Sequence, residues 1–81
     1  MNNNTRNIEI IINQIRERKD KFENDFLIIN AVSKEEEDVT IFVFQNKIPK
    51  DKWEMFEEGI SIKCVIEEGR EGSNILSKIL E

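Results

Sequence analysis

The sequence predicts an all-β fold, a five-stranded barrel with one short helix between its third and fourth strands. Three observations predict it. Apolar and β-branched residues form five short runs, separated by charged or glycine-containing segments. One segment, after the third run, carries the single tryptophan and has the pattern of a helix. The chain of 81 residues holds one domain, and the element order β-β-β-α-β-β is that of a small barrel.

The first element has two readings. Residues 1–6 are polar and asparagine-rich, so we expect a disordered tail there and a single domain over residues 7–81. Within residues 8–18, the isoleucines fit both helical spacing and strand alternation. Five isoleucines in eight positions favour a strand, which would need a bulge to bring Ile15 inward. A helix here is the alternative, and it would give a small α+β interaction domain.

The second and third elements are predicted strands. A charged loop over Lys19–Asp25 precedes the nearly continuous apolar run Phe26–Val32. Lys34–Asp38 is a solvated turn, and Val39–Phe44 alternates cleanly. We expect the β-branched residues of that strand inside the barrel, with Phe42 and Phe44 toward the outside or under the helix.

The second half of the chain supplies the helix and two more runs. Lys50–Glu58 is predicted as a helix of about two turns that ends at Gly59. Trp53 and Phe56 share a face and should close one end of the barrel. A strand from Ile60 to Ile66 and a glycine hairpin follow, and residues 74–80 form either a last strand or a short terminal helix.

Composition limits the chemistry. Histidine is absent and Cys64 is the single cysteine, so neither a disulfide nor a Cys/His zinc site can form, and we expect Cys64 to be buried. The chain has no nucleophile–base pair and no phosphate-binding glycine loop, so we expect no catalytic activity. No stretch approaches the about 18 apolar residues of a membrane span, and no apolar signal region opens the chain. We therefore expect a soluble, cytoplasmic protein.

Charge is distributed unevenly. The net charge is −5, which disfavours contact with phosphate unless basic groups gather on one face. Four basic residues do gather within six positions, whereas Glu35–Asp38 forms an acidic block elsewhere. We read the acidic block as a solvated turn and not as a cation site.

Four short motifs occur in order along the chain. They are Ile12-x-x-Ile15-Arg16-Glu17-Arg18-Lys19, then Val39-Thr-Ile-Phe-Val-Phe44, then Lys52-Trp53-x-x-Phe56-Glu57-Glu58-Gly59, then Ile60 to Glu68 with Arg70-Glu71-Gly72. Over almost the whole chain this series resembles the OB-fold domain, of the tRNA-anticodon type, of bacterial DNA polymerase III α subunits. Two features depart from that family: Lys34-Glu-Glu-Glu-Asp38 replaces its Asp-x-Thr-Gly turn, and Gln45 replaces its proline after the third strand.

The resemblance implies a non-catalytic domain that binds single-stranded DNA or RNA, with other replicase domains as possible partners and with no cofactor and no metal. Such binding needs cations along the phosphates and aromatic rings on which bases stack. The candidate residues for phosphate are Arg16, Arg18, Lys19 and Lys21, those for stacking are Phe22, Phe42 and Phe44, and Lys47 and Arg70 are second-rank candidates. The alternative is a protein-interaction or architectural domain of the same shape, which the acidic excess favours.

Overall fold

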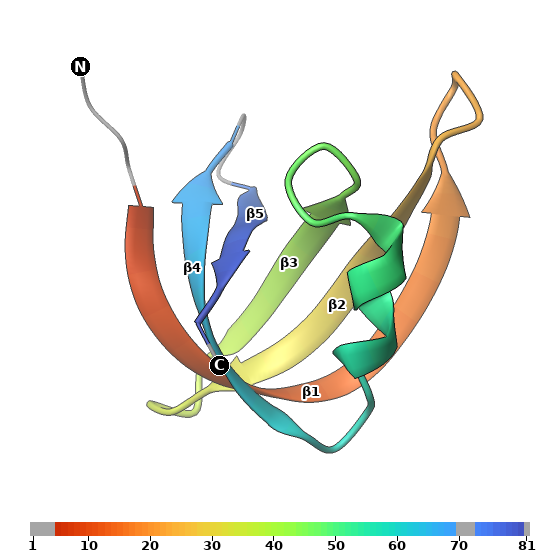
Figure 1. Ribbon diagram of the computed structural model, residues 1–81. Coiled ribbons are helices and arrows are strands. Elements are labelled where there is room, and N and C mark those ends of the chain that lie inside the picture. Colours follow the sequence, from red (N-terminus) through yellow and green to blue (C-terminus); the bar gives the residue numbers. More distant parts are fainter. Residues whose placement is uncertain (1–4, 70–72, 81) are drawn as a thin grey trace.

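The computed structural model describes residues 5–69 and 73–80. Figure 1 shows a sheet closed into a barrel, with one short 3-10 helix beside it. The closed strand order is β1-β2-β3-β5-β4, which confirms the predicted all-β barrel with a helix between the third and fourth strands. The elements are β1 (Thr5–Lys19), β2 (Asp25–Ser33), β3 (Asp38–Phe44), the helix η1 (Lys50–Met55), β4 (Ser61–Glu68) and β5 (Asn74–Ile79).

The isoleucine-rich segment is a strand and not a helix. β1 curves along the barrel (Figure 1), pairing with β4 over its first half and with β2 over its second half. A β-bulge shifts the register between Ile12 and Gln14. Before the bulge Ile10 and Ile12 are buried, and after it Ile15 packs against the core. The bulge thus resolves the conflict between the two isoleucine patterns, as expected for a strand that serves two neighbours.

β1 begins inside the segment predicted to be a tail. Thr5 pairs with Glu67 of β4 and Arg6 pairs with Ile66, so a tail over residues 1–6 is wrong for these two positions. Both side chains are exposed, and the pairing with β4 places their backbone in the sheet although they bury nothing. Residues 1–4 lie outside the described residues.

Alternation along β2 and β3 builds the barrel interior. Leu27, Ile29 and Ala31 of β2 are buried, and they lie opposite buried residues of β3. Val39, Ile41 and Val43 are buried as predicted, whereas Phe42 and Phe44 are half-buried on the other face. Burial also alternates along β2: every second side chain is buried, although the sequence is apolar at nearly every position.

The helix between β3 and β4 is shorter than predicted. The helix ends at Met55 instead of Glu58, because Phe56 is extended with φ −85° and ψ 120°. Trp53 and Phe56 are both buried in the core, as predicted, and the indole Nε1 of Trp53 donates to the Ile48 carbonyl at 3.1 Å. Gly59 does not cap the helix: with φ 94° it turns the chain toward β4 and donates its N–H to Ile12 at 2.6 Å.

The last two strands close the barrel. Residues 74–79 are a strand, which pairs antiparallel with β4 and parallel with β3 at two positions, so the helical alternative for this segment is excluded. Cys64 is fully buried, as expected, and this burial raises the pKa of its thiol to about 11. The thiol therefore stays protonated at neutral pH and packs as a small apolar group.

Candidate nucleic-acid interface

Three phenylalanine rings form a continuous surface on the outside of β2 and β3. Residues paired across an antiparallel ladder point to the same face, and Phe26 is paired with Phe44. The ring centroids of these two are 5.4 Å apart, and those of Phe42 and Phe44 are 6.3 Å apart with nearly parallel planes. All three side chains are half-buried. We call Phe26, Phe42 and Phe44 the aromatic surface.

Two arginines of β1 flank the aromatic surface. In the β1–β2 ladder Arg18 is paired with Phe26, and Arg16 is paired with Ile28, the neighbour of Phe42 on the adjacent strand. Both arginines are exposed, and neither forms an ion pair with a carboxylate of residues 5–69 or 73–80. The guanidinium of Arg18 donates to the Glu17 backbone carbonyl, at 3.2 Å. These charges therefore stand beside the aromatic surface without a neutralising partner.

The outer face near these groups carries little negative charge. From Gln14 to Arg18 on β1 and along β2, the outward positions carry arginine, glutamine, asparagine and apolar residues. The acidic Glu17 belongs to the opposite parity, paired with the buried Leu27, and the outward Glu9 lies before the bulge, where it is paired with Lys63 of β4. On β3 the outward acidic residue is Asp38, at the strand end remote from Phe44. The aromatic surface is therefore cationic on its β1 side, whereas its Phe44 end adjoins the carboxylates of Asp20 and Asp25.

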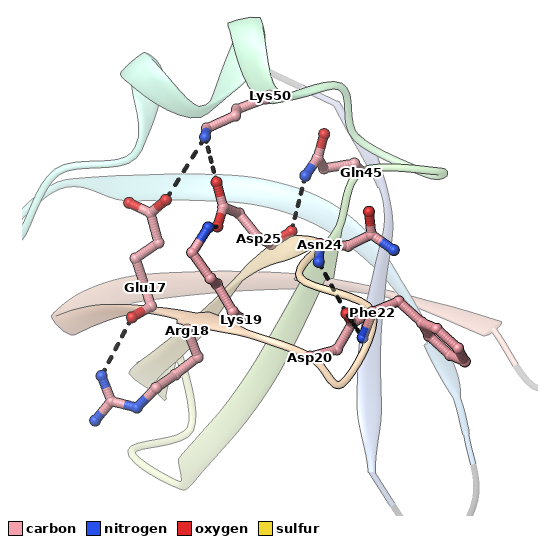
Figure 2. Close-up of polar contacts among 9 residues, drawn as sticks. All are labelled: Glu17, Arg18, Lys19, Asp20, Phe22, Asn24, Asp25, Gln45 and Lys50. Atoms are coloured by element: carbon pink, nitrogen blue, oxygen red, sulfur yellow. Dashed lines mark hydrogen bonds and ion pairs between the residues drawn. The ribbon is translucent and has the colours of Figure 1, made fainter.

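The loop between β1 and β2 carries two further candidates at its tip. Asp20 Oδ1 accepts hydrogen bonds from the backbone N–H groups of Phe22 and Asn24, both at 2.9 Å, which fixes the loop (Figure 2). The Phe22 ring is 73% exposed. The Lys21 ammonium lies 5.4 Å from the centroid of that ring. An aromatic ring and a cation therefore stand together in solvent.

A cleft connects this loop to the aromatic surface. It has a volume of about 430 Å³ and lies between the loop and the end of β3. Phe44 forms one wall, and the other lining side chains are carboxylates and amides, Asp20, Asn24, Asp25, Gln45 and Asn46. The cleft therefore places hydrogen-bonding groups at one end of the aromatic surface.

Lys19 has a different neighbourhood from the arginines. It is paired with Asp25 on the inward parity, and its ammonium lies 2.9 Å from that carboxylate (Figure 2). Lys50 of η1 reaches the same carboxylate and also Glu17, at 3.8 Å. Hydrogen bonds from Lys50 and Lys19 lower the pKa of Asp25 from 3.8 to about 2. These ion pairs connect η1 to the end of the β1–β2 loop. The positive charge of Lys19 is therefore balanced by Asp25.

Asp25 makes the fold sensitive to acid. Because its pKa is lower in the folded state, its stabilising contribution is present above pH 3.8 and is lost as the pH falls through about 2. Asp25→Asn is expected to melt below the parent protein at neutral pH, with a difference in Tm that closes over this range. Thermal melts followed by circular dichroism test this, with Asp51→Asn as control. A difference that stays constant with pH would contradict it.

The remaining candidates are placed less favourably or not described. The Lys47 ammonium lies 3.0 Å from Glu67, and hydrogen bonds from Lys47 and Ser77 lower the pKa of that carboxyl. The positive charge of Lys47 is therefore balanced by this ion pair. Arg70 lies outside the described residues.

Phe26 belongs to the surface but was not among the candidates. Its run is apolar at nearly every position, so the apolar pattern alone singles out neither face. The one polar residue in the run, Asn30, shares the parity of Phe26 and marks the outward face. That residue was the signal available in the sequence.

Comparison of the chain with known protein families, with curated proteins and with solved structures gives no match. Among the described residues no group of three histidine, cysteine or acidic side chains is placed to hold a metal ion. None of the helical structure in residues 5–69 and 73–80 has the length and apolar character of a membrane span.

Proposed function

We propose that the protein is a non-catalytic domain that binds single-stranded nucleic acid. The observation that carries this proposal is the aromatic surface flanked by Arg16 and Arg18. Stacking of a base on an aromatic ring contributes about 1–3 kcal/mol and tolerates any base, since every base has a π face. The arginines supply cations for the phosphates between stacked bases.

The site suggests how a strand would lie. Bases stack on Phe42 and Phe44, the backbone passes the arginines at the β1 edge, and one base enters the cleft beside the loop. Phe22 and Lys21 then contact the strand from the loop tip. We propose, from the family resemblance, that this domain works in a replication protein of the DNA polymerase III α type, in the cytoplasm.

The proposal predicts a weak dependence of binding on salt. For single strands, the logarithm of the binding constant falls by about 0.7 per phosphate contact for each tenfold rise in salt. Two contacts from the arginines, with Lys21 as a third, give a slope between roughly −1.4 and −2.1. Fluorescence anisotropy of labelled oligo-dT and of a mixed-sequence strand, titrated at several salt concentrations, measures it. Absence of binding at low salt would remove the proposal.

A protein-interaction or architectural role is the second candidate. The aromatic rings are half-buried and packed together, which also suits a flat apolar partner surface. The acidic excess favours this candidate as well. It predicts no oligonucleotide binding, together with self-association that is lost in Phe44→Ser, measured by sedimentation.

A further inference from the structure

A groove separate from the aromatic surface runs between β5 and the chain leading into η1. Its volume is about 390 Å³. Met55 and Leu80 line it and are 39% and 43% exposed, which makes them two of the few large apolar side chains that solvent reaches. Ile48 lines the same groove and joins it to the core. The groove therefore offers an apolar floor open to solvent.

Lysines surround this floor. Lys47, Lys52 and Lys78 line the groove, and none of the described lining residues is acidic. Lys47 is balanced by Glu67, but Lys52 and Lys78 form no ion pair with a carboxylate of residues 5–69 or 73–80. In a chain of net charge −5, this gathering of cations attracts an anionic ligand to an apolar site. We call it the lysine groove.

Although the barrel is closed, part of one edge of β5 is not paired with another strand along the lysine groove. β5 pairs with β3 only at Asn74 and Ile75. From Leu76 to Ile79 the strand pairs with β4 alone, so its other backbone edge faces the groove without a neighbouring strand. Such an edge accepts an extended segment through main-chain hydrogen bonds, and adjacent pockets hold alternate side chains.

We infer that the lysine groove docks an extended acidic segment of a partner protein. Its backbone pairs with the open edge of β5, its apolar side chains cover Met55 and Leu80, and its carboxylates reach Lys52 and Lys78. Charge complementarity selects this occupant. The site shares no residue with the aromatic surface, so the inference is independent of nucleic-acid binding.

The test uses a fluorescein-labelled peptide of about six residues, an ordinary strand length, in which leucine alternates with glutamate. A matched peptide carries glutamine in place of glutamate. The acidic peptide is expected to bind more tightly than its neutral match. The double variant Lys52→Gln/Lys78→Gln is expected to weaken it roughly tenfold, the effect of two surface ion pairs. The charge-matched control Arg6→Gln/Lys34→Gln, at two residues that line a separate cleft, leaves binding unchanged.

Amide chemical-shift mapping locates the bound peptide. Shifts at Ser77, Lys78 and Ile79 support edge pairing. Equal binding of both peptides, or equal weakening by the two double variants, would overturn the inference. It would also be overturned if oligo-dT displaced the peptide and itself lost affinity in Lys52→Gln/Lys78→Gln, or if those lysines supported self-association instead.

Discussion

Replacement of Phe44 by alanine is expected to weaken the binding of a labelled single strand by about one to two orders of magnitude. A stacked base contributes about 1–3 kcal/mol, and 1.4 kcal/mol is a factor of ten. Phe44 should have the largest effect in the aromatic surface, because it is the ring of the three that also lines the cleft. Fluorescence anisotropy with oligo-dT at low salt measures the loss.

The conservative variant Phe44→Leu separates stacking from packing. Leucine retains an apolar side chain beside Phe26 but has no π face, so the fold is expected to persist while most of the affinity is lost. Met55→Ala, which removes an exposed apolar side chain away from the aromatic surface, serves as the control. Parental affinity in Phe44→Leu would show that base stacking on this ring makes no contribution.

Replacement of Trp53 by alanine is expected to have the largest effect on stability. Truncation of a buried aromatic residue costs about 3–5 kcal/mol. It also leaves the Ile48 carbonyl without the indole donor. Because a chain of this length has a total stability of roughly 4–12 kcal/mol, the variant should lose a large fraction of it and unfold at a clearly lower urea concentration than the parent. Urea titration followed by circular dichroism tests this without the tryptophan signal.

Trp53→Phe provides the graded comparison. It keeps most of the ring in the core and removes the N–H donor, so we expect a loss of about 1–2 kcal/mol. A Trp53→Ala protein that unfolds at the parental urea concentration would contradict the role of η1 as a packed part of the barrel.

The order and faces of the strands could be predicted from local pattern. Val39–Phe44 alternates without ambiguity, and its inward and outward residues lie where the alternation places them. The isoleucine segment was ambiguous because a bulge makes a strand imitate helical spacing around Ile12. The early end of the helix has no local signal, since Phe56 leaves the helix to enter the core, a tertiary effect.

The residue types of the candidate site could be predicted from the sequence, but the ion-pair partners of its basic side chains could not. Arg16 and Lys19 are similar in sequence context, yet the parity of β1 turns Arg16 outward and Lys19 toward Asp25. Lys50 and Gln45, which also bind Asp25, come from a segment about 20 residues or more away in the chain. No local sequence pattern indicates such long-range pairing. Only the structure therefore shows which basic side chains are paired with a carboxylate, as Lys19 is, and which are not.

Amide chemical-shift mapping with a short oligo-dT strand tests the central claim most directly. The claim is that the outer face of β1, β2 and β3 binds single-stranded nucleic acid. We predict salt-sensitive shifts at Arg16 and Arg18, at Phe26, Phe42 and Phe44, and at the loop tip around Phe22. An unchanged spectrum at saturating oligonucleotide, or shifts confined to β4 and β5, would contradict it.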